Sequence, residues 1–224
     1  MPVRRIESEV RSRQGVNLLA PLPPAETYEP GVRLTSQGEM AGCVYLVTQG
    51  MVKLFHRYPD GREWIVELAA GGDLVGAQPA VLGEPCLETA VTLTECRLAR
   101  WRAPEFLARL NRDAGLAIQV CRMISRHVRA LQCRLLESGV QPARWKFEGL
   151  LRWWADAATA RPGRPAGEFD LPLSRDELGQ FLFIAPCQVS RLLSAAEKDG
   201  LIARQGRRIR VLPNALRPAA ALPA

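Results

Sequence analysis

The apolar positions of residues 31–101 lie in short runs separated by turn sequences such as QGE, PDGRE, GGD and LGEP. Short β-rich runs with turns at this spacing are typical of a sandwich or a barrel-like roll. The preceding stretch, APLPPAETYEP, is too rich in Pro to be a regular helix throughout, and organised structure is expected to begin near Gly31. Strands are predicted in VRLT, CVYLVTQ, MVKLFHRY, EWIVEL, TAVTLTEC and CRLARW.

The pattern becomes helical after residue 102, first in RAPEFLARL and then in DAGLAIQVCRMISRHVRALQCRLLESG. The second segment has no Gly or Pro between Leu116 and Glu137, which predicts a helix of about 35 Å at 1.5 Å per residue. Its apolar arc is broad enough to face two partners, the β-roll of its own chain and a symmetry mate. An ordinary core helix is the alternative. The residues predicted at a dimer seam are Val120, Ile124, His127, Val128, Leu131 and Leu135.

A second domain is predicted after residues 139–142 (GVQP), which have the composition of a hinge. ARWKFEGLLRWWADAAT is predicted to be an amphipathic helix, and RPGRPAG a loop. The organisation expected from the pattern is a roll with an N-terminal extension in 1–112, the long helix in 113–138 and the second domain in 139–224.

The second domain contains a helix-turn-helix followed by a hairpin. Ser174 and Glu177 form a capping box that opens a short helix, and a turn follows at Ile184-Ala185. Pro186 suits the first position of a second helix, which runs to about Asp199 and is closed by Gly200. LIARQ and RRIRVL then flank a Gly as a hairpin. Together these elements predict a winged helix-turn-helix, a motif that binds DNA.

Charge supports a polyanionic partner. The chain has 224 residues, of which 47% are hydrophobic, and 30 Lys+Arg against 23 Asp+Glu give a net charge of +7. Residues 1–138 hold 17 basic and 15 acidic residues, a net of +2, whereas residues 139–224 hold 13 and 8, a net of +5. The basic excess therefore lies mainly in the domain with the winged helix-turn-helix.

Several functional classes are disfavoured. No run of 18 apolar residues exists and MPVRRIESEV lacks the layout of a signal peptide, so we expect a cytoplasmic protein with no membrane partner. The six cysteines include no C-x-x-C pair, so no metal site is expected. Only two histidines are available, and no G-x-S-x-G, H-E-x-x-H or P-loop pattern appears, so no catalytic residue is assigned and no enzyme is expected. A hydrolase based on carboxylates is the remaining enzymatic alternative.

The segment SRDELGQFLFIAPCQVSRLLSAAEKDGLIARQGRRIRV resembles the DNA-binding domain of the Crp/Fnr family of bacterial regulators. Upstream, QGE, VYLVTQGMVKLF, DGREWIVEL and GGDLVG resemble that family's cyclic-nucleotide-binding β-roll. The resemblance covers about residues 31–212 and implies an α+β fold: an N-terminal jelly-roll-like β-roll (a double-stranded β-helix) for sensing an effector, a dimerisation helix and a C-terminal winged helix-turn-helix. It implies a homodimeric transcription regulator, activator or repressor, whose partners are a palindromic double-stranded DNA operator, itself and RNA polymerase.

The family's recognition helix carries the frame E-x-x-S/G-R, and here the frame is Cys187-Gln188-Val189-Ser190-Arg191. The resemblance implies that Arg191 reads guanine in the major groove, which is worth about 1–3 kcal/mol against a wrong base. Cys187 stands in place of the Glu and cannot accept a hydrogen bond from cytosine as a carboxylate does, so the base preference should depart from the usual half-site. Gln188 is expected to read adenine or bind phosphate. Phosphate contacts are expected from Arg175, Arg207 and Arg208, for which an ordinary solvated arginine is the alternative.

Cys187 is also a candidate redox site. It falls near the second position of the recognition helix, where exposed amides and the helix dipole favour a thiolate. Oxidation would add bulk or charge at the DNA groove and weaken binding. The alternative is an inert thiol that fills the interface between the two helices.

The sensor departs from its family pattern. Cyclic-nucleotide binders place a Glu after GD-x-x-G and an Arg-Ser near the end of that loop, whereas Ala77 and Glu88 stand there in this chain. A carboxylate would repel the cyclic phosphate, so cyclic AMP is not expected to bind. The residues expected to line the effector pocket are Gly76, Ala77, Gln78, Glu88 and Thr89.

Residue types also bear on the other effectors of the family. Residues 1–42 contain no cysteine, so an iron–sulfur cluster is not expected. The RQGR segment, the PN tail and the initial Met-Pro resemble haem-dependent carbon-monoxide sensors, but Gln78 occupies the region where they need a His. His56 and His127 are more often packed or surface residues than ligands. Haem in another arrangement stays open, as does a dimeric protein-interaction module that does not bind DNA; salt-dependent binding to duplex DNA separates the last alternative.

Overall fold

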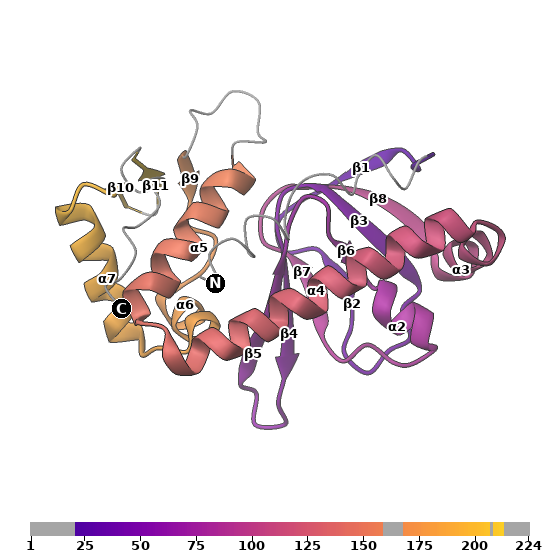
Figure 1. Cartoon of the computed structure of the whole chain (residues 1–224), viewed down its shortest axis with the longest axis horizontal. Helices are drawn as coiled ribbons and strands as arrows, with labels where there is room; N and C mark the ends of the chain where they lie inside the picture. Colours follow the sequence, from indigo (N-terminus) through magenta and orange to yellow (C-terminus); the bar gives the residue numbers. More distant parts are fainter. Residues whose placement is uncertain (1–20, 159–167, 207, 213–224) are drawn as a thin grey trace. The chain divides into compact units, whose positions relative to one another are not determined.

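The structure is a computed structural model that describes residues 21–158, 168–206 and 208–212. The chain divides into two compact units, Met1–Gly139 and Val140–Ala224 (Figure 1). The first holds a β-roll and three helices, and the second holds the remaining helices and a small sheet. The predicted fold class, a β-roll, a long helix and a helix-turn-helix with a wing, is confirmed.

The β-roll consists of two four-stranded antiparallel sheets. The first has the order β1 (Ala25–Tyr28), β8 (Cys96–Arg102), β3 (Cys43–Gln49) and β6 (Leu74–Val75). The second has the order β2 (Arg33–Thr35), β7 (Thr89–Thr92), β4 (Val52–Arg57) and β5 (Glu63–Ala69). Each of the six predicted runs covers one of these strands, or all but its last residue.

The packing of strand β3 explains why its sequence is a continuous apolar run. Val44 and Leu46 pack in a core cluster with residues of the unit's helices, while Tyr45 and Val47 pack in the cluster between the two sheets. Successive side chains of a strand point to opposite faces. Because both faces of β3 are covered, both sets of positions are apolar.

The roll begins earlier than the sequence analysis expected. Strand β1 lies within the Pro-rich stretch and pairs with β8 from Ala25 opposite Ala99 to Tyr28 opposite Cys96. Pro24 and Pro30 flank the strand and do not interrupt it. An edge strand needs only one set of backbone partners, so neighbouring prolines do not prevent it from pairing.

Three helices complete the first unit: α2 (Ala77–Leu82), α3 (Ala103–Arg112) and α4 (Ala114–Val140). Helix α2 and strand β6 were not predicted from the sequence. Helix α4 has 27 residues and is therefore about 40 Å long. The Oδ1 atom of Asp113 accepts a hydrogen bond from the backbone amide of Leu116 at 2.9 Å, which caps the start of α4.

The second unit begins with α5 (Ala143–Ala158), which buries Phe147, Leu151 and Trp154. Helix α4 continues through Val140, so the predicted hinge is reduced to residues 141 and 142. The predicted loop at 161–167 lies outside the described residues. Strand β9 (Glu168–Asp170), which was not predicted, pairs with β11 (Arg208–Val211) and makes the sheet three-stranded in the order β10 (Ile202–Gln205), β11, β9.

Candidate nucleic-acid interface

Helix α6 (Arg175–Leu182) opens with the capping box that the sequence predicted. The backbone amide of Glu177 donates to Ser174 Oγ at 3.2 Å, and the amide of Ser174 donates to Glu177 Oε2 at 2.8 Å. Two of the helix's first amides thus have partners. The helix buries Leu178, Phe181 and Leu182, and Arg175 is exposed in its first turn.

The turn after α6 sets the second helix close to the first. Phe183 adopts the left-handed conformation with φ 56°, and the amide of Ile184 donates to the carbonyl of Gly179 at 2.9 Å. A Cβ atom on Gly179 would lie 2.7 Å from the carbonyl oxygen of Ile184, closer than real Cβ contacts allow. Only glycine fits this close approach of the turn to α6.

Helix α7 (Pro186–Lys198) has one buried and one exposed face. Val189, Leu193 and Ala196 are buried, whereas Cys187 and Arg191 are exposed. Positions four apart share one face of a helix, so these two side chains lie on the same exposed surface. This surface of α7, with Gln188, is called the recognition face below.

Gln188 and Ser190 are engaged within their own helix. The Oε1 atom of Gln188 accepts a hydrogen bond from the backbone amide of Ala185 at 3.1 Å. Ser190 is half-buried, and its Oγ donates to the carbonyl of Pro186 at 3.4 Å. The side-chain oxygen of Gln188 therefore already has a partner at the start of the helix. Its NH₂ group is the part of the side chain that can act as a donor toward DNA.

The wing is the antiparallel hairpin of β10 and β11, with Gln205 opposite Arg208 and Gly206 at its tip with φ 61°. Arg208 is exposed, and Arg207 lies outside the described residues. The guanidinium of Arg204 forms an ion pair with Glu197 at 3.0 Å, which ties the wing to α7.

Sequence reasoning missed a residue that holds α7 in place. Arg144, on α5, donates to Glu148 at 2.8 Å and forms an ion pair with Asp199 at 2.9 Å, just after α7 ends. The spacing of Arg144 and Glu148 by four residues was the available signal. Both acidic neighbours raise the pKa of Arg144, with the Glu148 hydrogen bond the larger cause.

The structure divides the predicted dimer seam between two faces of α4. Val120 is only 2% exposed and Ile124 packs against the same core cluster, while the Nδ1–H of His127 donates to Glu67 Oε1 at 2.7 Å. All three contact the β-roll of their own chain. Val120 is covered there, which corrects its assignment to a seam, whereas Ile124 and His127 are half-buried and their assignment stays a prediction. The prediction fails for Val120 because helical periodicity identifies apolar positions but not the neighbour that covers each one.

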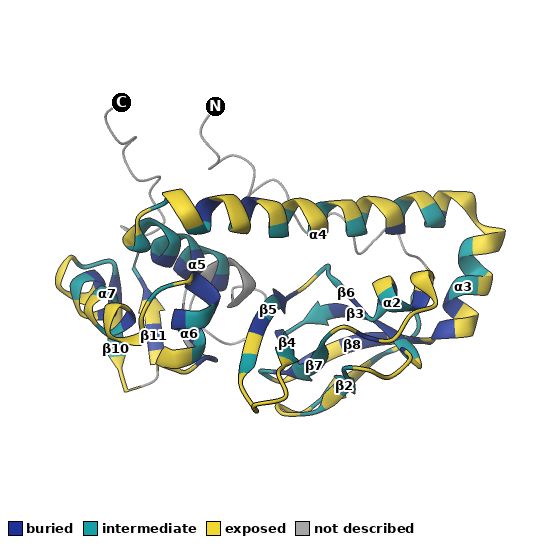
Figure 2. Ribbon diagram, turned by 90° about the horizontal axis from the view of Figure 1, so that it is seen from below, coloured by how far each residue is buried: buried dark blue, intermediate teal, exposed yellow. Residues whose placement is uncertain are grey.

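The other predicted seam residues remain available. Val128 is 45% exposed and Leu135 is 69% exposed, and Leu131 is half-buried. Figure 2 shows exposed residues along the length of α4. Exposed apolar residues recur there at helical spacing and define the α4 stripe: Ile118, Cys121, Val128 and Leu135.

The predicted effector residues do not all face a common space. Ala77 is 1% exposed and belongs to the core cluster, so it does not face a ligand, which corrects its assignment to a pocket; Gln78 beside it is exposed. Gly76 precedes α2 with φ 79°, and a Cβ there would lie 2.7 Å from the carbonyl oxygen of Cys43. The burial of Ala77 could not be predicted from the sequence, because a small residue in a loop is compatible with either burial or exposure.

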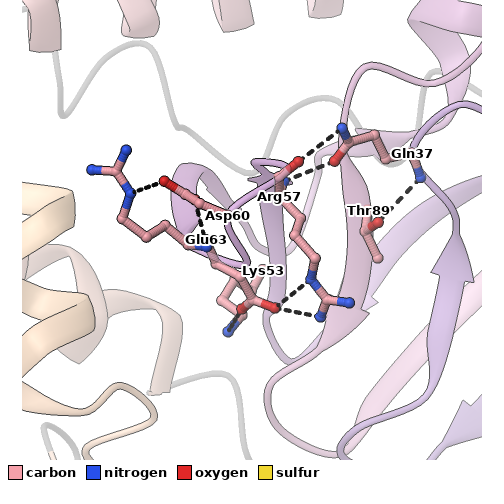
Figure 3. Close-up of polar contacts among 7 residues, drawn as sticks. Gln37, Lys53, Arg57, Asp60, Glu63 and Thr89 are labelled. Atoms are coloured by element: carbon pink, nitrogen blue, oxygen red, sulfur yellow. Dashed lines mark hydrogen bonds and ion pairs between the residues drawn. The ribbon is translucent and has the colours of Figure 1, made fainter.

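Thr89 and Glu88 lie beside other polar groups of the second sheet. The Oγ1 atom of Thr89 accepts a hydrogen bond from the backbone amide of Gln37 at 3.1 Å, and Figure 3 shows the Gln37 side chain paired with the backbone of Arg57. Glu88 is half-buried. Burial raises the pKa of its carboxyl and the charge of Glu67 raises it further, whereas His127 and His56 act in the opposite direction.

Within the described ranges, no group of three or more His, Cys, Asp or Glu side chains is arranged to hold a metal ion. Over the same part of the chain, every helix is too short or too polar to cross a membrane.

Comparison with known proteins agrees with this architecture. Residues 25–113 match the cyclic nucleotide-binding domain family, and residues 148–217 match the Crp-like helix-turn-helix domain family. The transcriptional activatory protein AadR of Rhodopseudomonas palustris is 27% identical over 83% of this chain and 76% of its own length. The transcriptional activator protein FnrA of Stutzerimonas stutzeri is 27% identical over 81% of this chain and 74% of its own length. Among solved structures, FixK2 of Bradyrhizobium japonicum aligns with a TM-score of 0.70 at 23% identity, over 88% of this chain and 98% of that one.

The β-roll, the long helix and the winged helix-turn-helix together define a DNA-binding transcription regulator. This chain belongs to the Crp/Fnr family.

Proposed function

We propose that the protein is a sequence-specific regulator that binds a palindromic operator as a homodimer, with α7 in the major groove. The observation that carries the proposal is the recognition face, where Cys187, Gln188 and Arg191 are exposed opposite the buried Val189 and Leu193. An α-helix fits the major groove of B-DNA, and its exposed side chains reach the base edges.

Arg191 is the proposed base reader, through two hydrogen bonds from its guanidinium to the O6 and N7 atoms of guanine. Cys187 offers no carboxylate to cytosine, so discrimination at the neighbouring base pair is weak. Gln188 reads no adenine in this proposal, because bidentate recognition of adenine needs its amide oxygen, which accepts from Ala185. Its NH₂ group donates to phosphate instead. Arg175, Arg207 and Arg208 supply further phosphate contacts that position the duplex without reading it.

Dimerisation is proposed through the α4 stripe together with Leu131. A two-fold symmetric pair of α4 helices buries Val128 and Leu135 against their own copies, and apolar side chains at helical spacing form such seams. The two recognition faces then read inverted half-sites, whose centres lie about one helical turn of DNA apart, or a multiple of it.

The sensor is proposed to respond to something other than cyclic AMP, because Glu88 stands in the sequence where the family's cyclic-nucleotide binders have the Arg that binds phosphate. The names of AadR and FnrA as activators support activation as the mode of regulation, with RNA polymerase as the partner. The proposed activity is binding without catalysis. A bacterial regulator of this kind works in the cytoplasm, where the chromosome lies.

Binding-site selection on random duplex DNA tests the proposal, with the full chain and with Arg191→Ala run in parallel. The expected result is an enriched inverted repeat with guanine at a fixed position in each half, lost in Arg191→Ala. Enrichment of no sequence, together with weak binding that does not depend on salt, would reject the proposal and favour a dimeric protein-interaction module.

A further inference from the structure

Helix α4 is joined to the β-roll by a polar contact in addition to its apolar one. The apolar contact is made by Leu116 and Val120, and the Nδ1–H of His127 donates to Glu67 Oε1 at 2.7 Å about two turns further along the helix. The side chain of His127 is 31% exposed and that of Glu67 is 15% exposed, so solvent screens the pair only partly.

Acidic groups from three parts of the roll act on His127 through their charges, and one of them, Glu67, is in direct contact with it. Glu67 lies on β5, Asp73 on the turn before β6, and Glu88 on the segment before β7. His56 on β4 also acts on Glu88, and its charge opposes the rise in the pKa of that carboxyl. A protonated His127 therefore places one positive charge among three carboxyl groups, and a neutral His127 leaves them without it.

We propose that His127 and Glu67 form a proton-sensitive latch between α4 and the β-roll, and that the proton is an effector of this regulator. In the protonated state the charged hydrogen bond holds α4 against β5. In the deprotonated state the ring can keep its Nδ1–H, but the positive charge of the ring is lost, so the hydrogen bond is weaker and the like charges of Glu67 and Glu88 are no longer offset.

The sign of the effect follows from both groups. The hydrogen bond to Glu67 raises the pKa of His127 above 6.5, burial opposes the shift, and the charges of Glu67, Asp73 and Glu88 add to it. The stabilisation is therefore fully present below pH 6.5 and is lost as the pH rises through the pKa of the folded state. The Glu88 carboxylate acts in the same direction, because it favours the protonated ring and is left facing the like charge of Glu67 once His127 is neutral.

The latch has a route to DNA binding through the chain itself. Helix α4 ends at Val140 and α5 begins at Ala143, so residues 141 and 142 link α4 to the first helix of the DNA-binding unit. If α4 is less firmly attached to the β-roll, the C-terminal end of α4, to which the DNA-binding unit is linked, is less firmly fixed as well. The effect on operator affinity rests on the function proposed above, whereas the latch itself does not.

The first test is a titration of the two histidine rings by NMR in the full chain, with His56→Gln to assign the signals. The pKa of His127 is expected above its ordinary value and is expected to fall in Glu67→Gln. The matched control is Glu63→Gln, which removes a carboxylate from the same strand where it pairs with Arg57. A His127 pKa at or below 6.5, or one that Glu67→Gln leaves unchanged, would overturn the latch.

The second test is hydrogen exchange of the α4 amides between pH 6 and pH 9, corrected for the intrinsic pH dependence of exchange. Protection should fall by about fivefold or more in the parent and in Glu63→Gln as His127 deprotonates. It should be low at every pH in Glu67→Gln and stay high in His127→Lys, which keeps its charge through this range. Equal pH dependence in the parent and Glu67→Gln would overturn the proposal even if His127→Lys fails to fold.

The third test is the affinity for the selected operator over the same pH range. A change of about fivefold or more in the parent, absent in Glu67→Gln and retained in Glu63→Gln, is expected. The same pH dependence in all three proteins would overturn the coupling to DNA. Failure of every protein to bind duplex DNA at any pH would instead refute the proposed function, and the first two measurements would still decide the latch.

Discussion

The Oε1 atom of Gln188 accepts a hydrogen bond from the backbone amide of Ala185 at 3.1 Å, and this contact helps to close the first turn of the proposed recognition helix. Ala185 has no side chain that can cap the helix, so Gln188 gives its amide a partner from within the helix. A residue that sequence alone assigned to DNA is thus also part of the framework.

Substitution of Gln188 separates these two roles. Gln188→Glu keeps the acceptor for Ala185 and loses the NH₂ donor, so the thermal stability should be unchanged while affinity falls for all DNA sequences alike. Gln188→Ala loses the acceptor too and should lower the free energy of unfolding by about 0.5–1 kcal/mol. Thermal melting and gel-shift assays check the pair, and a change of preference confined to one base pair would show that Gln188 reads a base.

Arg191→Ala should abolish sequence preference while leaving weak, salt-sensitive binding. The loss expected at the guanine position is about 1–3 kcal/mol, because a base contact disappears and the phosphate contacts stay. The control is Arg208→Ala, which should weaken binding evenly across sequences and reduce the salt slope by about one. Gel-shift titrations against the operator and its single-base variants make the comparison, and unchanged preference in Arg191→Ala would reject the assignment of α7.

Charged substitutions in and beside the α4 stripe should give monomers. Val128→Glu and Leu131→Glu would place two carboxylates against each other at a two-fold seam, where like charges without solvent repel strongly. Arg122→Glu, exposed on the same helix outside the stripe, is the control and should stay dimeric. Sedimentation velocity distinguishes the two states, and an intact dimer in both Glu variants would move the interface elsewhere.

Cyclic AMP should neither bind nor alter operator affinity. Glu88 is half-buried beside Glu67, so a cyclic phosphate would meet carboxyl groups in a partly desolvated place. Calorimetric titration of the full chain checks this expectation. Binding at the micromolar level would contradict the interpretation of Glu88.

Mild peroxide should lower operator affinity through Cys187. Of the six cysteines, Cys121 and Cys187 are exposed, and Cys187 alone lies on the recognition face. A sulfinate there would face phosphate groups with like charge. Operator affinity is measured before and after oxidation. It should fall on oxidation in the parent and in Cys121→Ser but not in Cys187→Ser. Equal losses in all three, or no loss in any, would exclude Cys187 as the redox site.

The helix-turn-helix was predictable because residues close to each helix end in the sequence determine its boundaries. The capping box of Ser174 and Glu177 and the proline at position 186 mark helix starts within a few residues of sequence. Strands β1 and β9 were missed because each is short and pairs with a strand far along the chain. Their formation is decided by the partner and the register rather than by a pattern of their own.

The candidate sites were predictable only in part, for a related reason. Val120 and Val128 lie on the same helix with the same side chain, yet one is buried against the roll and the other is exposed. The pairing of His127 with Glu67 joins residues that are 60 apart in sequence, and the residues next to each of them do not indicate it. Sequence identified which side chains carry chemistry, but tertiary packing decided which of them meet.

The pairing of β9 with β11 has a consequence for how the DNA-binding unit assembles. Phe169 lies opposite Ile209, and all of α6, α7 and β10 fall between these partners along the chain. The sheet can therefore close only when the helix-turn-helix is already nearly in place, and closing that long loop carries an entropic cost that local pairing does not. The unit should fold and unfold as one cooperative body, so a chain truncated before Arg208 would lose the helices along with the wing.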